Sequence, residues 1–211
     1  MEDVLKVYER PYDPAEPVVC LDERPVNLHG EKRKGRHARP GKPARYDYEY
    51  VRKGTANIFC AVEPRAGKHI TRVTAQRGGP DFAKLLSVIA CSYREAKTIH
   101  LVLDNLSTHF VSSLIAHYGE KDGRALWSKF DVHYTPKHGS WLNQAEIEIG
   151  ILNRQCLGRR RIAAIEELRN QVAIWNRRAN RSRQTINWRF TRKKARTRFG
   201  YHPLKISRSK D

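Results

Sequence analysis

The feature that most constrains the fold is a pair of short apolar runs, each followed directly by an acidic residue. Residues 18–21 (VVCL) are followed by Asp22 and Glu23, and residues 100–103 (HLVL) are followed by Asp104. Short apolar runs bounded by polar residues are typical of strands buried inside a sheet. If the two strands are parallel neighbours, Asp22 and Asp104 emerge at the same edge of the sheet.

Two carboxylates held that close together repel each other unless a proton or a cation lies between them. Carboxylate oxygens are hard ligands that suit Mg²⁺ or Mn²⁺, and these ions in turn bind phosphate oxygens. The alternative is that each aspartate only ends a strand at a solvated turn, where this residue type is common. The pair of aspartates alone does not decide between these two interpretations.

The remaining patterns predict a mixed α/β sheet flanked by helices. Residues 57–62 and 69–74 favour two strands joined in a hairpin by the turn 63–68. Helical spacing of apolar residues follows in 81–93 and 108–118, a further short strand is expected at 130–134, and Gln144 begins another helix. Strands followed by alternating strands and helices indicate a sheet that helices cover.

The charge of the chain points to a polyanionic partner. The 211 residues include 41 Lys and Arg against 22 Asp and Glu, a net charge of +19. Residues 154–198 alone hold 13 Arg and 2 Lys against two Glu. A surplus this large is usually tolerated where nucleic acid supplies the missing charge, so double-stranded DNA or another nucleic acid is the leading partner class.

Other classes of protein are disfavoured by what the sequence lacks. It has no apolar run of membrane-spanning length and no basic-then-apolar signal at its start, so we expect no membrane and a cytoplasmic, nucleoid-associated protein. The four cysteines lie far apart in the sequence, which favours reduced core residues over a zinc site or a disulfide framework.

Composition also suggests how the chain is divided. Three prolines in residues 1–17 favour a lead-in or linker, and a concentration of Lys, Arg, Gly and Pro in residues 29–53 favours a basic loop inserted in the domain. We therefore expect one domain over 18–200 and a basic tail over 201–211.

A third carboxylate near the start of the last helix would complete a metal site. Glu146 and Glu148 compete for this position, because both flank the apolar stripe of the helix at similar angles. Glu146 also has a purely structural interpretation, since Asn143 three residues earlier would form a capping box with it. Helical spacing alone leaves the choice open.

Five strings, taken in order, resemble one known family. They are CLDE (20–23), RPGKPARYDYEYVRKGTANIF (39–59), LVLDNLSTH (101–109), HYTPKHGSWLNQAEIE (133–148) and NWRFT (187–191). Together they resemble the bacterial mariner-like DDE transposases of insertion sequence family 630, over about residues 18–200. Many members of this family have Pro-Ile where this chain has Gln144 and Ala145, a difference that leaves the following glutamate in register.

This resemblance implies a ribonuclease H-like fold and assigns the catalytic acids. Asp22, Asp104 and Glu146 take the positions of the family's catalytic residues, which also bind metal, and the implied cofactor is a pair of Mg²⁺ or Mn²⁺ ions. Two such ions would stabilise the attacking and the leaving oxygen of a phosphodiester. Glu23 is expected to point to the other side of its strand and to take no part in the chemistry.

The implied function is that of a transposase catalytic domain, which cleaves DNA at transposon ends and transfers the strands into a TA target. The family also implies a homodimer on DNA. Residues 1–17 are too short for the helix-turn-helix region that reads the ends, so the chain is expected to be a fragment, a second reading frame or a degenerate copy, and a separate N-terminal polypeptide is one candidate source of that region. The alternatives are a catalytically silent, basic nucleic-acid-binding remnant of a transposase and a ribonuclease H-like nuclease that cuts without joining.

The residues expected to contact DNA are basic or aromatic side chains near these strings. They carry affinity through phosphates or stack on bases. His109 could instead pack locally at the start of a helix, and Trp141 could instead fill the core beneath the next helix. The full set is Lys32, Arg33, Lys34, Arg36, His109, Lys137, His138, Trp141, Arg159, Arg160, Arg161, Arg177 and Arg178.

Overall fold

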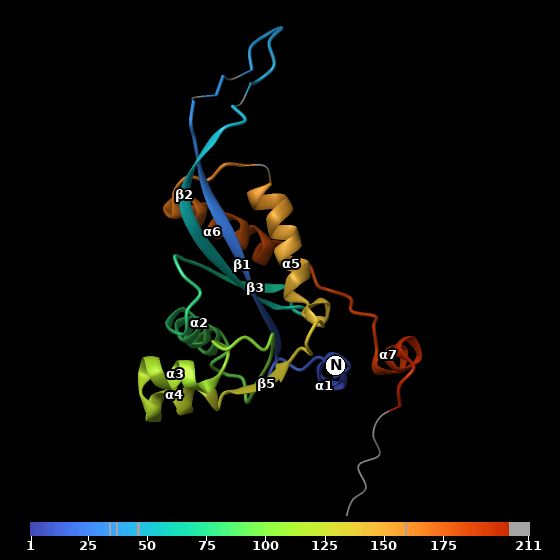
Figure 1. The fold of residues 1–211 in the computed structure, drawn as a ribbon. Helices are drawn as coiled ribbons and strands as arrows, with labels where there is room; N and C mark the ends of the chain where they lie inside the picture. The colour runs from blue at the N-terminus through green and yellow to red at the C-terminus, as the bar shows by residue number, and fades with distance from the viewer. Residues whose placement is uncertain (34, 37, 46, 159, 203–211) are drawn as a thin grey trace, which may run out of the picture.

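A five-stranded mixed sheet forms the centre of the molecule in the computed structural model, which describes residues 1–202 except 34, 37, 46 and 159 (Figure 1). The order of strands across the sheet is β3-β2-β1-β4-β5. The strands are β1 (Val18–Glu31), β2 (Tyr50–Glu63), β3 (Lys68–Thr74), β4 (Ile99–Leu103) and β5 (Phe130–Tyr134).

The pairing of the strands confirms the mixed α/β sheet that the sequence predicts. β1 to β3 form an antiparallel meander, whereas β4 lies parallel to β1 and β5 lies parallel to β4. Parallel neighbours need crossover connections, and helices supply them here. The tight turn that joins β2 to β3 has Gly67 at φ +60°, where an added Cβ would lie 2.5 Å from the main-chain carbon of Arg183.

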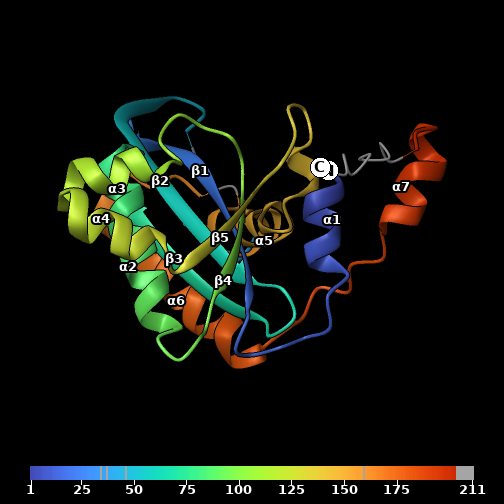
Figure 2. The ribbon, with the colours of Figure 1, turned by 90° about the horizontal axis from the view of Figure 1, so that it is seen from below.

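Three helices cover one face of the sheet (Figure 2). They are α2 (Gly79–Ser92), α3 (Val111–Tyr118) and α4 (Glu120–Trp127). The core beneath them includes the fully buried side chains of Phe59, Phe82 and Leu101. The sequence patterns do not predict α4. It packs closely on α3 at Gly123, where a Cβ would lie only 2.7 Å from the main chain of Ile115.

The other face and the long ribbon β1–β2 are covered by the remaining helices. α5 begins after a short 3-10 turn η1 and continues into the π-helical turn η2, and α6 crosses the ribbon. These elements are α1 (Glu2–Tyr8), η1 (Ser140–Leu142), α5 (Ala145–Leu152), η2 (Asn153–Leu157), α6 (Ile165–Ser182) and α7 (Arg192–Phe199).

The first seventeen residues differ from the expected lead-in. Residues 2–8 form helix α1, and Val4 and Leu5 are fully buried against the sheet. The prolines at 11, 14 and 17 all follow this helix, so they end it without preventing it. α1 also lies beside α7, and Arg196 of α7 forms an ion pair of 2.7 Å with Glu2 of α1.

β1 is much longer than the short strand expected over residues 18–21. It continues past Asp22 to Glu31 because β2 pairs with it along that whole length, with a register shift between Leu28 and His29. The basic segment 29–53 is therefore partly strand, and only 32–49 forms the connecting tip, which projects beyond the body of the molecule (Figure 1).

Two further expectations concern the whole chain. In the part of the chain that the structure describes, no helix combines the length and the apolar character that a membrane span requires. The expected basic tail 201–211 lies outside the described residues, apart from Tyr201 and His202.

Candidate functional site

Asp22 and Asp104 lie beside each other where the parallel pairing of β1 and β4 ends. That pairing ends with Cys20 matched to Val102, two residues before each aspartate, and the charge of Asp104 acts on Asp22. Burial raises the pKa of Asp22 to about 7, and the neighbouring carboxylates of Glu146 and Asp104 add to this rise, while the main-chain N–H of Glu23 opposes it. Asp22 is therefore in the electrostatic field of two other acids.

Glu146 reaches this point because the start of α5 is fastened to β1. The Nδ2 group of Asn143 donates a hydrogen bond of 2.7 Å to the carbonyl of Leu21, the residue before Asp22. The hydroxyl of Tyr8 in α1 donates to the carbonyl of Leu142, one residue earlier, at 2.8 Å. These two buried bonds hold the first turn of α5, and with it the exposed Glu146, next to the edge of the sheet.

The capping box that offered a structural role for Glu146 is not formed. The side-chain oxygen of Asn143 accepts from the main-chain N–H of Ala145 at 3.2 Å, and the main-chain N–H of Glu146 bonds to the carbonyl of Asn143. No described residue caps α5 with its side chain. The carboxylate of Glu146 is thus not engaged as a helix cap.

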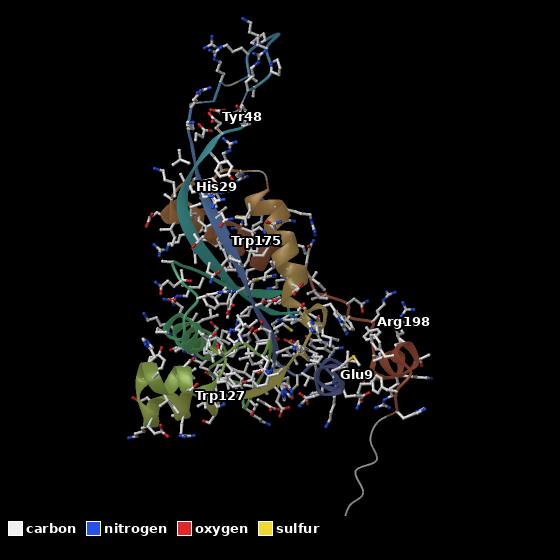
Figure 3. The ribbon with its side chains drawn as sticks, in the orientation of Figure 1. Glu9, His29, Tyr48, Trp127, Trp175 and Arg198 are labelled. Carbon is white, nitrogen blue, oxygen red and sulfur yellow. The ribbon has the colours of Figure 1, made fainter. Side chains whose placement is uncertain are left out.

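Glu148, the competing acid, is committed elsewhere. Its carboxylate lies 2.8 Å from Nε2 of His69, and both side chains are buried. The ring of His69 packs edge-to-face on Trp175 of α6, with ring centroids 5.5 Å apart, beneath the ribbon (Figure 3). The pair ties α5 to β3 and α6, on a different side of α5 from Glu146.

His109 contacts both Asp104 and Glu23, the acid that was expected to take no part in the chemistry. Its Nε2 lies 2.7 Å from Glu23 and its Nδ1 lies 2.7 Å from Asp104, and the ring is almost fully buried against Phe82. Burial would lower the pKa of His109, but hydrogen bonds from Asp104 and Glu23 outweigh it and raise the pKa to about 9. The imidazolium therefore pairs with both acids.

This arrangement corrects the expectation that His109 contacts DNA. The ring is buried and occupied on both nitrogens, so the interpretation as a locally packed residue holds. Glu23 points away from Asp22, as expected, but it anchors His109. The five-residue spacing of Asp104 and His109 was the available signal for this contact, and the sequence held none for the partner on β1.

The donor set at this edge fits a hard divalent cation. All three acids offer oxygen ligands, and Asp22, the most buried of them, lies in the electrostatic field of the other two, while Oδ1 of Asp104 is held 2.7 Å from Nδ1 of His109. The oxygens of the three acids do not all lie within 4.8 Å of one another. The three carboxylates therefore do not form one closed set of ligands around a single point in this structure.

The loop before α5 presents two of the expected DNA contacts to solvent. Lys137 and His138 are exposed, and Gly139 is required there because a Cβ would lie 2.6 Å from Pro136. Trp141 is 44% exposed and packs edge-to-face on Phe190 with centroids 5.4 Å apart. The interpretation of Trp141 as a core plug is wrong, because the neighbouring Leu142 fills the core.

Several expected phosphate contacts brace the projecting tip. The guanidinium of Arg161 donates to the main-chain oxygens of Glu49 and Tyr48, at 2.9 and 3.2 Å, at the base of the tip (Figure 3). Lys32 pairs with Glu49 at 3.1 Å, and a nitrogen of Arg33 lies 3.9 Å from the same carboxylate. Their charge is thus partly balanced.

The other expected contacts differ in their surroundings. Arg177 and Arg178 are exposed on α6, Arg36 is exposed in the tip, and Arg160 donates to Gln171 at 2.9 Å. Lys34 and Arg159 lie outside the described residues.

Solved structures similar to this chain include complexes of the Mos1 transposase. A Mos1 mariner paired end complex with Mn matches with a TM-score of 0.51 and 15% identity, over 84% of this chain and 54% of that one. The Mos1 strand transfer complex matches with a TM-score of 0.54 and 14% identity, over 82% and 50%. The chain thus spans about half the length of these proteins, and the likeness confirms the predicted ribonuclease H-like fold.

Sequence comparison places the chain more narrowly. No curated protein sequence matches it significantly. A family model described as DDE superfamily endonuclease matches residues 17–169, a segment that contains β1 to β5 and all three candidate acids. The chain belongs to the DDE superfamily endonuclease family.

Proposed function

We propose that this chain is the catalytic domain of a transposase, which cleaves DNA phosphodiesters at transposon ends and joins the freed strands to target DNA. The observation that carries the proposal is the gathering of Asp22, Asp104 and Glu146 where the parallel pairing of β1 and β4 ends, with Asp22 buried in the field of the other two acids. Such a concentration of negative charge costs stability unless a cation offsets it. Endonuclease family membership supports the same conclusion.

Asp22, Asp104 and Glu146 are the residues that would hold two Mg²⁺ or Mn²⁺ ions. When bound, such ions supply Lewis-acid stabilisation of the attacking and leaving oxygens of a phosphodiester. His109, paired with Glu23, fixes the side chain of Asp104. The hydrogen bond of Asn143 to β1 fixes the position of the start of α5, and therefore the position of Glu146 relative to Asp22.

The partners follow from the same proposal. The similar structures are paired end and strand transfer complexes of the Mos1 transposase, which supports DNA as the substrate of this chain. Transposon ends, a TA target, a homodimer and a separate helix-turn-helix polypeptide belong to this proposal. The bacterial, nucleoid-associated location belongs to it as well.

The proposal is tested by incubating the purified chain with an end-labelled DNA duplex and Mg²⁺ or Mn²⁺. We expect metal-dependent nicking that chelator abolishes, and joining of an added 3′-hydroxyl end. Asp104→Asn should lose both activities, whereas Asp122→Asn, an exposed residue of α4, should retain them. Asparagine keeps the size of the side chain and removes the charged ligand.

The other outcomes separate the alternatives. Nicking without joining would support a ribonuclease H-like nuclease. DNA binding with no metal-dependent nicking, even after a helix-turn-helix polypeptide is supplied, would support a silent remnant. Nicking that survives Asp104→Asn would remove Asp104 from the site.

The exposed arginines of α6 are proposed to bind DNA phosphates. Replacing Arg177 and Arg178 together with alanine is expected to weaken DNA binding and to lower the slope of log affinity against log salt by about two, since each phosphate contact releases about one counterion. Fluorescence anisotropy across a salt series measures both. The double change of Arg94 and Lys97, exposed beyond α2, is the matched control. An unchanged slope would mean that this face of α6 does not meet DNA.

A further inference from the structure

A second cluster of metal-ligating side chains lies on the face of β4 and β5 that α1 covers. The parallel register sets His100 beside Asp131, and His133 follows two residues later on the same face. Among the described residues, this is the set of His, Cys, Asp and Glu side chains whose ligand atoms all lie within 4.8 Å of one another. Both histidines are buried, whereas Asp131 is half exposed.

The three ligand atoms have the spacing of a metal's first coordination shell. Nδ1 of His100 lies 3.1 Å from Nε2 of His133 and 3.1 Å from Oδ2 of Asp131. The remaining side of the triangle, from Nε2 of His133 to Oδ2 of Asp131, is 3.4 Å. Ligands about 2.0–2.1 Å from a tetrahedral ion lie roughly 3.3 Å apart, so one ion fits against all three atoms.

The outer nitrogens of both histidines face carboxylates. Nδ1 of His133 lies 2.7 Å from Asp3 of α1, and Nε2 of His100 lies 3.8 Å from Glu16. Histidines that bind a metal through one nitrogen almost always donate from the other to a carboxylate, a carbonyl or water. The cluster therefore has supporting acids on both sides, supplied by α1 and the segment after it.

The positions of the ring protons leave one buried nitrogen of the cluster without a hydrogen-bond partner in the described part of the chain when no cation is bound. If His133 donates to Asp3, its Nε2 is an acceptor and can pair with His100 only when Nδ1 of His100 carries the proton. Nε2 of His100 is then a lone pair that faces Glu16, and this buried atom indeed has no hydrogen-bond partner among the described residues.

A bound metal removes this conflict. When an ion takes Nδ1 of His100, the ring proton moves to Nε2, where it is directed at Glu16. The same ion takes Nε2 of His133, whose other nitrogen still donates to Asp3. The nitrogen of His100 that faces Glu16 then carries a proton in place of a lone pair, although at 3.8 Å it does not form a hydrogen bond with that carboxylate, which also pairs with Arg10.

We propose that His100, Asp131 and His133 bind one divalent transition-metal ion of the zinc class, with water as the fourth ligand, and that the ion locks α1 to the sheet. Two imidazoles and one carboxylate favour Zn²⁺ over Mg²⁺. The site is distinct from the three acids, because His100 precedes Asp104 by four residues, roughly 13 Å along an extended strand.

The test is a metal titration of the purified full-length chain, stripped with chelator and kept in excess Mg²⁺ to fill the oxygen site. Calorimetry with Zn²⁺ should give one ion per chain. Co²⁺ should give the intense visible absorption of a tetrahedral site. Zn²⁺ should raise the Tm beyond the value in Mg²⁺ alone. None of these measurements requires DNA or activity, so they can succeed or fail independently of the proposed transposase function.

Two variants make the test specific. Asp131→Asn removes a half-exposed ligand without disturbing the core and should weaken Zn²⁺ binding by more than about 10-fold, whereas the exposed Asp122→Asn should not change it. His133→Asn should abolish the Co²⁺ absorption, with circular dichroism to verify the fold. Failure to bind Zn²⁺, or equal affinity in wild type and Asp131→Asn, would overturn the proposal and leave a hydrogen-bonded histidine pair.

Discussion

Replacing Glu146 with glutamine is expected to lower metal-dependent DNA nicking on the order of 10³-fold, because it removes one of the charged groups arranged around the reacting phosphate. Glu146 is exposed in the first turn of α5, within the electrostatic reach of Asp22. DNA affinity should stay close to that of the wild type, since a carboxylate offers phosphate no attraction. A single-turnover nicking assay measures the rate, and anisotropy measures the binding.

Glu148→Gln is the matched control, two residues further along the same helix. Its amide can still bond to His69, so nicking should stay within a few-fold of wild type, while replacing the buried carboxylate weakens its hydrogen bond to His69 and lowers the Tm. If Glu148→Gln abolishes nicking in a folded protein and Glu146→Gln does not, the assignment of the third acid is wrong. Helical spacing leaves open whether Glu146 or Glu148 is the third acid, and the same substitution at each position decides between them.

Asp22→Asn is expected to stabilise the metal-free chain at pH 8. The pKa of Asp22 is about 7 in the folded chain against an ordinary value of 3.8, so the folded state binds a proton between these two values that the unfolded state has lost. The free energy of unfolding therefore falls as the pH rises from about 4 to about 7 and is constant above. The whole shift corresponds to about 4 kcal/mol, which sets the upper limit of the gain.

Thermal unfolding at two pH values measures this effect. At pH 8 the variant should unfold about 5–10 °C above wild type, and at pH 4 the difference should almost vanish, because wild-type Asp22 is then protonated. Excess Mg²⁺ should raise the Tm of wild type at pH 8 and that of the variant much less. Equal Tm values of wild type and variant at pH 8 without metal would contradict the crowding of acids around Asp22.

Sequence reasoning predicts the parts of this site that depend on strand order. The apolar runs before Asp22 and Asp104 bring the two acids to one edge if their strands are parallel neighbours, and the structure shows that the strands are parallel neighbours. The pattern could not show that β1 continues past Asp22, because the antiparallel partner that extends it, β2, lies in a segment whose composition resembles a loop. Local sequence patterns predict whether a segment is a strand or a helix better than they predict where it begins and ends.

The contacts that hold the site together lie beyond local patterns. The bond from Asn143 to Leu21 and the contact of His109 with Glu23 join residues far apart in the chain. The residue types alone do not indicate which distant residue each of them contacts. α1 was missed for a related reason, since seven residues are marginal as an isolated helix. Burial of Val4 and Leu5 against the sheet supplies the stability that its length does not.

The strand order also bears on how the protein is made. The meander β1 to β3 joins neighbours in sequence and can assemble while the rest of the chain is still being synthesised, but the partner that β1 needs on its other side is β4. Closing that long connection carries an entropic cost, which places it late in folding. Until then Asp22 is free of the crowding that Asp104 and Glu146 impose. The three acids therefore come together late in folding, when most of the apolar core is available to offset the cost of their repulsion.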